Sequence, residues 1–335
     1  MKRVLFAVLI LILAMVACSP PAEVPQVTAP AGEQTARDLQ EGKPFRFVHV
    51  NRQHPIVRLM ALGYFEACEK YDVECVDMGV DGVDIPGWIA KGEASITLGS
   101  SGIVFGHDKP TYEVGKKIVE AGIPQVAIHI QLKNNEIPGL NGWVATDNVD
   151  YAIRSAERMG ELISCKGTVQ ITQGSYNDTE NPVSEAFTKK MNEICPDVIV
   201  LDPKEEGFDS PQAIAKIVAI LRGNPEIVAA YSTTGAGAYN WAMAAQEIGY
   251  KAGQIKIAGM DYSRQNLDLV ASGWVDFLVG QPLYEETYKA VECLVGELQG
   301  NPCPFENPFP APLVDKTNMD MYFGFCDRAE KLILE

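Results

Sequence analysis

The sequence has few of the residues and motifs from which enzymes build active sites. Only four histidines occur in 335 residues, and none has the HExxH or HxH spacing of a metal site. Two glycine-rich stretches, "GSSG" at 99–102 and "GAGA" at 235–238, lack the spacing of a nucleotide-binding loop. No Gly-x-Ser-x-Gly elbow is present. We therefore expect that the protein binds no metal or cofactor and is not an enzyme. The alternative is a secreted α/β enzyme.

Basic residues are also scarce. The chain has 28 Lys and Arg against 44 Asp and Glu, a formal net charge of −16. A strongly acidic surface repels phosphate-rich partners, which argues against nucleic acid or anionic lipid. With 47% hydrophobic residues, the chain can bury two cores of ordinary domain size.

The apolar run near the N-terminus is too short to cross a bilayer. Residues 4–17 are fourteen apolar residues, whereas a span needs roughly twenty. They follow Lys2 and Arg3, which is the order of a secretory signal. "MVAC" at 15–18 resembles the lipobox of bacterial lipoproteins, although Met15 stands where a branched residue is usual. The resemblance implies that residues 1–17 are removed and Cys18 is lipidated; a signal-anchor, or a signal with an incidental cysteine, is the alternative.

In the segment that follows Cys18, apolar residues do not recur at the spacing of a helix or a strand. Residues 18–43 are rich in Pro, Ala, Gln, Glu and Thr, and such a composition cannot bury enough surface to fold. We predict a disordered tether that holds a globular body off the membrane.

Seven further cysteines lie in the body, and an exported compartment permits disulfides. Cys68 and Cys75 flank a helix-to-strand turn, and Cys165 and Cys195 each stand just before a predicted strand. The other three are Cys293, Cys303 and Cys326, so one of the seven cysteines remains outside any disulfide pair. We expect structural bridges or buried thiols, with the pairing open.

From residue 45 the chain alternates short β-branched runs with amphipathic stretches, the pattern of parallel sheets covered by helices. The predicted strands are 45–51, 73–79, 94–100, 124–130, 142–147, 167–174, 197–202, 227–233, 254–261 and 275–281. This number of strands is large for a single open sheet. It favours two similar α/β lobes, each a mostly parallel sheet flanked by helices. A late helix at 283–298 is expected to return to the first lobe.

Polar residues follow many of these predicted strands. Ligands of open α/β sheets bind beyond the carboxyl ends of the strands, so these residues are the candidate site. They are His54, Ser100, Ser101, His129, Asn177, Asp178, Thr234, Asp261 and Gln281.

Three segments resemble the type I periplasmic binding proteins, in the ribose- and galactose-binding branch that serves ABC importers. They are "GWVATDN", "PEIVAAYSTTGAGAYNWAMAAQEIG" with "IKIAGMDYS", and "ASGWVDFLVGQPLYEETYKAVECL". The resemblance implies two Rossmann-like lobes joined by a multi-strand hinge. Residues 44–146 and 282–314 would form the N-terminal lobe, and residues 147–281 and 315–335 the C-terminal lobe.

Carried over residue by residue, the resemblance implies that His54, Asp261 and Gln281 hydrogen-bond the ligand and that Phe208 stacks on it. Ile56 and Val57 stand where the family often has aromatic rings.

Several charged family residues are missing. His129-Ile130 stands where sugar binders commonly have Asp-Arg, and Thr234-Gly235 where they have Asn-Asp. No arginine near 177–187 matches the clamp of the second lobe. Because charge-assisted hydrogen bonds are then scarce, a less hydroxylated ligand such as a polyol, deoxysugar, nucleoside or small aromatic molecule stays open.

The sequence therefore predicts a monomeric, lipid-anchored solute-binding protein in the cell envelope, facing the periplasm or the exterior. It would capture a small neutral carbohydrate-like ligand by hinge closure and deliver it to an ABC permease. A sensory lipoprotein of the same fold is the main alternative.

Overall fold

A computed structural model describes residues 34–52, 54–82, 84–177 and 179–332. Its strands form two six-stranded sheets. The first has the order β11-β5-β4-β3-β1-β2, and all its neighbouring strands are parallel. Its strands are β1 (Phe45–Val48), β2 (Cys75–Asp77), β3 (Gly102–Phe105), β4 (Gln125–Ile128), β5 (Gly142–Thr146) and β11 (Glu306–Phe309).

The second sheet has the order β12-β10-β9-β8-β6-β7. Its strands are parallel except for β12, which runs antiparallel to β10. They are β6 (Gly167–Gln173), β7 (Val198–Glu205), β8 (Ile227–Ser232), β9 (Lys256–Met260), β10 (Phe277–Val279) and β12 (Leu313–Val314).

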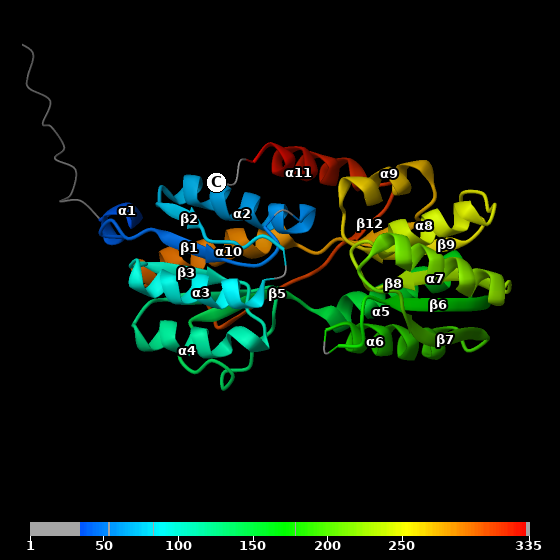
Figure 1. Ribbon diagram of the computed structural model, residues 1–335, viewed down its shortest axis with the longest axis horizontal. Coiled ribbons are helices and arrows are strands. Elements are labelled where there is room, and N and C mark those ends of the chain that lie inside the picture. Colours follow the sequence, from blue (N-terminus) through cyan, green and yellow to red (C-terminus); the bar gives the residue numbers. More distant parts are fainter. Residues whose placement is uncertain (1–33, 53, 83, 178, 333–335) are drawn as a thin grey trace, which may run out of the picture. The chain divides into compact units, whose positions relative to one another are not determined.

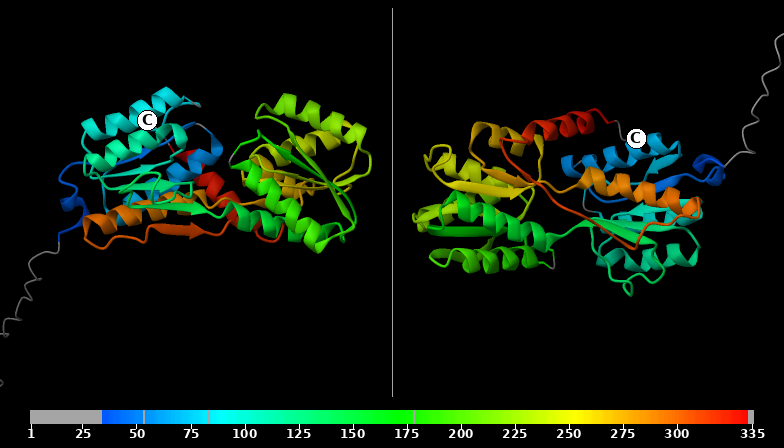
Figure 2. Two further views of the ribbon diagram at one scale, coloured as in Figure 1. Left: turned by 90° about the horizontal axis from the view of Figure 1, so that it is seen from below. Right: turned by 180° about the vertical axis from the view of Figure 1, so that it is seen from behind.

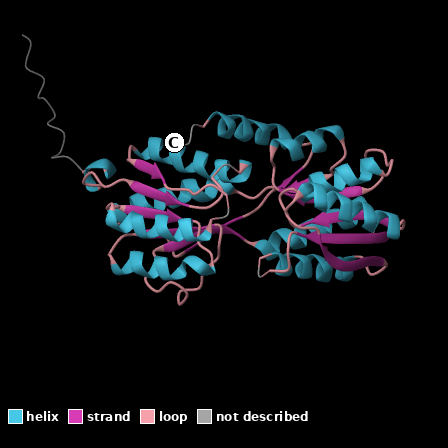
Figure 3. Cartoon of the chain, in the orientation of Figure 1, coloured by secondary structure: helices cyan, strands magenta, loops and turns pink. Residues whose placement is uncertain are grey.

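Helices cover both faces of each sheet (Figure 3). Around the first sheet lie α2 (Pro55–Tyr71), α3 (Ile85–Thr97), the 3₁₀ turn η1 (Lys109–Thr111), α4 (Tyr112–Glu120) and α10 (Leu283–Leu298). Around the second lie α5 (Asn148–Leu162), α6 (Glu180–Ile194), α7 (Ser210–Gly223), α8 (Gly237–Glu247) and α9 (Arg264–Ser272). The prediction of two α/β lobes is confirmed.

The chain passes between the two sheets at three places: between β5 and α5, between β10 and α10, and between β11 and β12 (Figures 1 and 2). After the second passage, α10 packs against α2, as predicted for the late helix. The two helices approach closely because Gly63 has no side chain: a Cβ there would lie 2.1 Å from the carbonyl oxygen of Tyr284. Thr287 Oγ1 donates to Met60 O across the same contact, at 2.7 Å.

Two features of the C-terminal part differ from the sequence-based boundaries. Leu313 and Val314, assigned to the N-terminal lobe, pair with β10 in the second sheet. The last helix, α11 (Met319–Lys331), packs against α2 of the first lobe as well as α9 of the second (Figure 1).

The predicted strand at 94–100 is wrong. Residues 94–97 are the last turn of α3, and the strand is Gly102–Phe105, after Gly99 turns the chain with φ 76°. The β-branched pair Ile96 and Thr97 imitates a strand locally, but "GIVF" is the segment buried between β1 and β4.

The predicted tether ends earlier than residue 43. The short helix α1 (Ala36–Leu39) belongs to the compact unit that begins at Thr35. The Gln40 side chain, 2% exposed, pairs with the backbone of Glu74 through both amide atoms, at 2.9 and 2.7 Å. This long-range contact orders a stretch whose composition suggests disorder. Residues 18–33, and Cys18 with them, lie outside the described residues.

The cysteines of the body form three disulfides and one buried thiol, in agreement with the expectation. The bridges are Cys68–Cys75, Cys165–Cys195 and Cys293–Cys303, and the thiol is Cys326. In the part of the chain that the structure describes, no helix combines the length and the apolar character that a bilayer span requires.

Candidate functional site

Asp261 is the most constrained of the predicted site residues. It follows β9 in the left-handed conformation, with φ 68°, and is 6% exposed. Its Oδ1 accepts a hydrogen bond of 2.6 Å from Gln281 Nε2. Its Oδ2 lies against Gly235, where an added Cβ would come within 2.3 Å of this oxygen. Glycine at 235 thus makes room for the carboxylate.

Burial raises the pKa of the Asp261 carboxyl. The hydrogen bond from Gln281 and the charges of His129 and His54 act in the opposite direction and only partly offset it. A carboxylate in this setting gains from an additional hydrogen-bond donor, such as a hydroxyl group of a bound molecule.

His129 follows β4 and also has a positive φ, of 63°. Its Nδ1 lies 3.4 Å from Oε2 of Glu286, which is fully buried in the first turn of α10. The imidazole itself is 43% exposed. Desolvation lowers the pKa of His129, but the contact with Glu286 and the charges of Glu286 and Asp261 outweigh it and raise that pKa.

Glu286 was missed by sequence reasoning. Burial raises its pKa, although the contact with His129 favours the ionised form. An acidic residue in the first turn of a helix is common for electrostatic reasons alone, so its position carried no functional signal.

His54 completes this group. It is the N-cap of α2, where its Nδ1 accepts a hydrogen bond of 3.3 Å from Ile56 N, and its side chain is exposed. His54, His129, Asp261, Gln281 and Glu286 are called the interlobe cluster below. Its members come from both lobes. The start of α2, the end of β4 and the first turn of α10 supply three of them from the first lobe, and the ends of β9 and β10 supply Asp261 and Gln281 from the second.

Thr234 lies at the carboxyl end of β8, but its hydroxyl is already used. Thr234 Oγ1 and Ser232 Oγ donate to Oε1 of Glu206, at 2.8 and 2.7 Å. Glu206 is 1% exposed, and burial raises its pKa. These three side chains form a buried hydrogen-bond network through Oε1 of Glu206, whose Oε2 has no hydrogen-bond partner among the described residues.

Asn177 and Phe208 lie beyond β6 and β7. Asn177 precedes α6, and its Oδ1 accepts from the backbone N–H groups of Thr179 and Glu180, at 2.9 and 2.8 Å. Phe208 is 71% exposed, and its ring lies against Gly174, where a Cβ would come within 2.2 Å of it. Asp178 lies outside the described residues.

Ser100 does not lie where the sequence placed it. It precedes β3, so it is at the amino end of the strand, at the opposite edge of the sheet from His129. Its Oγ donates to Ser95 O at 2.6 Å and so closes the end of α3. Ser101 similarly donates to Lys43 O. Both errors follow from reading the end of α3 as a strand.

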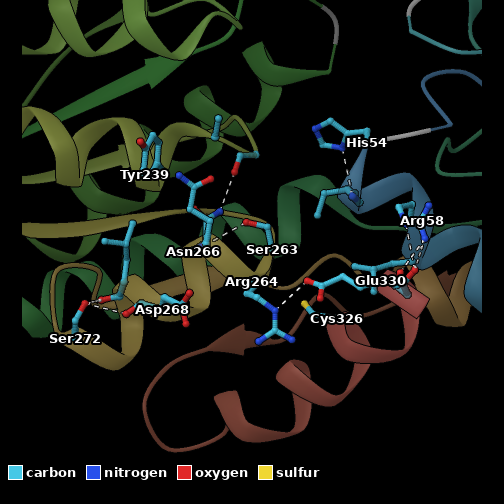
Figure 4. Close-up of a pocket in the computed structure, with 17 residues that line it drawn as sticks. His54, Arg58, Tyr239, Ser263, Arg264, Asn266, Asp268, Ser272, Cys326 and Glu330 are labelled. Carbon is cyan, nitrogen blue, oxygen red and sulfur yellow. Dashed lines mark hydrogen bonds and ion pairs between the residues drawn. The ribbon is translucent and has the colours of Figure 1, made fainter. Parts of the chain in front are cut away.

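A cavity of about 930 Å³ lies next to the interlobe cluster. The first turns of α2, the start of α8, the length of α9 and the end of α11 enclose it, and His54 and Gly235 border it (Figure 4). We call it the α11 pocket. No group of three or more potential metal ligands occurs in the described ranges.

Residues 46–302 match the model of the family described as periplasmic binding protein domain. The chain belongs to this family. The prediction of a binding protein rather than an enzyme is confirmed at this level.

Solved structures show the same fold. This periplasmic binding protein is similar to a sugar-binding protein of a sugar ABC transporter from Bacillus halodurans, with a TM-score of 0.78 and 19% identity over 84% of this chain and 100% of that one. It is also similar to an ABC transporter periplasmic solute binding protein from Actinobacillus succinogenes with bound D-allose, with a TM-score of 0.76 and 21% identity over 84% and 100%. An arabinose binding protein from Geobacillus stearothermophilus gives a TM-score of 0.75 and 18% identity over 84% and 99%.

Proposed function

We propose that this protein captures a small neutral carbohydrate-like ligand between its lobes and delivers it to an ABC permease in the membrane. The observation that carries the proposal is the interlobe cluster. Asp261 and Gln281 present an acceptor and an amide beside His54 and His129, so one ligand can contact both lobes. Hydroxyl groups suit this set because each can donate to a carboxylate and accept from an amide or imidazole.

Closure follows from the same arrangement. A ligand that touches both lobes stabilises the closed form by its differential contacts, and a hinge needs only a few φ/ψ changes to reach that form. The solved neighbours are named as binders of sugars, including D-allose and arabinose, which supports this ligand class.

The test is calorimetry on the chain from Ser19 onward, which keeps every described residue. The panel contains D-allose, D-arabinose, D-galactose, polyols and nucleosides. Asp261→Ala should weaken the binding of the sugar that binds best by about tenfold or more, because a charge-assisted hydrogen bond is lost. Asp197→Ala is the matched control, since Asp197 is exposed and precedes β7 at the opposite edge of its sheet.

Equal affinity of the Asp261 variant and the parent would remove Asp261 from the site. Binding of nucleosides but of no sugar or polyol would favour the less hydroxylated ligand class instead. Permease and ATPase genes next to this gene would favour import over sensing.

We further propose that the protein is anchored in the cell envelope through a lipid on Cys18. The support is the sequence alone: a positive start, fourteen apolar residues and "MVAC". Cys18→Ser should move the protein from the membrane fraction to the soluble fraction. An unmodified Cys18 in the mass spectrum of the mature N-terminal peptide would refute the anchor.

A further inference from the structure

The α11 pocket is larger than a single sugar ring needs. Its volume of about 930 Å³ lies near the top of the range of roughly 300–1,000 Å³ that accommodates drug-sized ligands. It adjoins the interlobe cluster at two residues. His54 belongs to both the pocket and the cluster, and Gly235, which lines the pocket, lies against Asp261 Oδ2. A ligand held by the cluster can therefore extend into the pocket.

Most of the charged side chains around the pocket already have partners in the protein. Arg58 donates to the backbone carbonyls at the end of α11, including that of Ala329 at 2.8 Å. Arg264 pairs with Asp327. It also pairs with Glu330, at 2.9 Å (Figure 4). These contacts fasten α11 to both lobes, and among the described residues Asp268, which is exposed on α9, is the charged side chain of the lining that they do not occupy.

Several polar side chains of α9 are occupied in the same way, whereas Gln265 is exposed. Asn266 Nδ2 donates to three backbone carbonyls, among them those of Gly235 at 2.8 Å and Asp261 at 2.9 Å. Ser263 Oγ accepts from Asn266 N, and Ser272 Oγ donates to Asp268 O. Most of the polar lining therefore serves the fold rather than the cavity.

The remaining walls are apolar. They come from α2, α8, α9 and α11 and include Ile56, Leu59, Tyr239, Leu269 and Ala329. An apolar group that enters such a cavity leaves water and loses no hydrogen bonds, so its transfer is favourable. One of these walls, α11, lies outside residues 46–302, the part of the chain that matches the family model.

We propose that the ligand is a glycoside whose sugar ring binds the interlobe cluster and whose apolar aglycone fills the α11 pocket. This inference rests on the proposed function and narrows its ligand class.

The experiment compares pairs of ligands by calorimetry on the chain from Ser19 onward. The pairs are the methyl and the phenyl glycosides of D-galactose, D-allose and D-arabinose. For the sugar that binds, the phenyl glycoside should bind at least about tenfold more tightly than the methyl glycoside, because only the phenyl ring is large enough to bury substantial apolar area.

Variants locate the aglycone. Ala329→Leu and Ser272→Leu each reduce the space in the pocket and should abolish the preference for the phenyl glycoside over the methyl glycoside. Ala271→Leu is the matched control: Ala271 is on α9, is exposed and does not line the pocket, so the preference should persist. Two filling variants are used because Ala329 is buried and its replacement can impair folding, which circular dichroism would reveal.

Three results would overturn the inference. Equal affinities for the two glycosides of a sugar that binds would refute the aglycone site and leave the proposed function intact. A preference that survives both filling variants would place the aglycone elsewhere. If neither the free sugars nor any glycoside binds, the proposed function fails and the inference fails with it.

Discussion

At the scale of single residues, two of the proposed ligand contacts have an uncommon backbone conformation. Asp261 and His129 have φ of 68° and 63°, in the left-handed region that residues with a Cβ rarely adopt. Each stands directly after a strand. Such conformations persist where neighbouring contacts hold the backbone in place. Here Asp261 N donates a hydrogen bond to Val279 O, and His129 N donates one to Val144 O.

A buried histidine outside the site makes the fold sensitive to acid. His107 is 5% exposed, lies 2.9 Å from Thr111 Oγ1 through Nδ1, and stacks on Phe105. Burial lowers its pKa from 6.5 to about 3. Because the unfolded chain takes up this proton below pH 6.5 and the folded chain does not, stability is lost as the pH falls from 6.5 towards 3.

The expected loss between pH 7.5 and pH 5 from this residue is about 2 kcal/mol in the free energy of unfolding. Urea titrations at the two pH values measure it. His107→Gln should be less stable at pH 7.5 but should lose less on acidification. A variant that loses as much as the parent would show that other groups cause the acid sensitivity.

At the scale of elements, the starts of helices hold the site loops in place. Ser263 caps α9, and Asn266 in its first turn ties the loop after β8 to the loop after β9 through carbonyls of both. His54 caps α2, which fixes one imidazole nitrogen; within the described residues no hydrogen bond engages the other, so it can contact a ligand. Loop positions in the cluster therefore depend on local helix signals as well as on the sheets.

The disulfide Cys165–Cys195 stabilises the second lobe away from this site. It joins the ends of α5 and α6, at the amino edge of β6 and β7. Because a cross-link restricts the unfolded chain, replacement of both cysteines by alanine should lower the free energy of unfolding by about 2–4 kcal/mol.

Denaturant titration checks the loss of stability, and calorimetry checks the site. Ligand affinity should not change, since the bridge lies at the edge of the sheet opposite Asp261. An unchanged denaturation midpoint, or a weakened ligand, would contradict this account.

At the scale of the whole folded unit, titratable side chains of both lobes lie close together beside the passages between the lobes. Thr146 Oγ1 in the first passage donates to Phe309 O in the third, at 2.9 Å, and Glu286 lies just after the second. His129 contacts Glu286 and is influenced by Asp261 of the other lobe. Protonation of one imidazole is thus coupled to carboxylates on both lobes.

This coupling predicts a dependence on pH. The folded-state pKa of His129 is raised, so its contribution to stability is complete below about pH 6.5 and is lost as the pH rises through the folded-state value. The stability difference between the parent and His129→Gln should therefore shrink from pH 6 to pH 9, as unfolding experiments can measure. The effect should be small, because solvent screens an imidazole that is 43% exposed. A difference that grows with pH would refute the assigned direction.

Much of the architecture follows from local patterns. Alternation of short β-branched runs with helical stretches is enough to predict nine of the strands and the two lobes, because burial of each element leaves a period in its own residues. Local patterns gave a wrong prediction at 94–100, where the end of α3 resembles a strand. They also missed the order around Gln40, because the contact that orders it is with Glu74, just before β2. Ser100 was misplaced for the first of these reasons.

The sequence by itself determined the order of the elements, the binding-protein class and the residues at the ends of most strands, since these depend on short-range periodicity and recognisable segments. Only the tertiary structure decided which cysteines pair, that His129 meets Glu286, and that α11 closes a pocket beside Asp261. The physical reason is that a contact between residues far apart in the chain leaves no trace in the local pattern of either one. It arises from how packed elements bring their faces together.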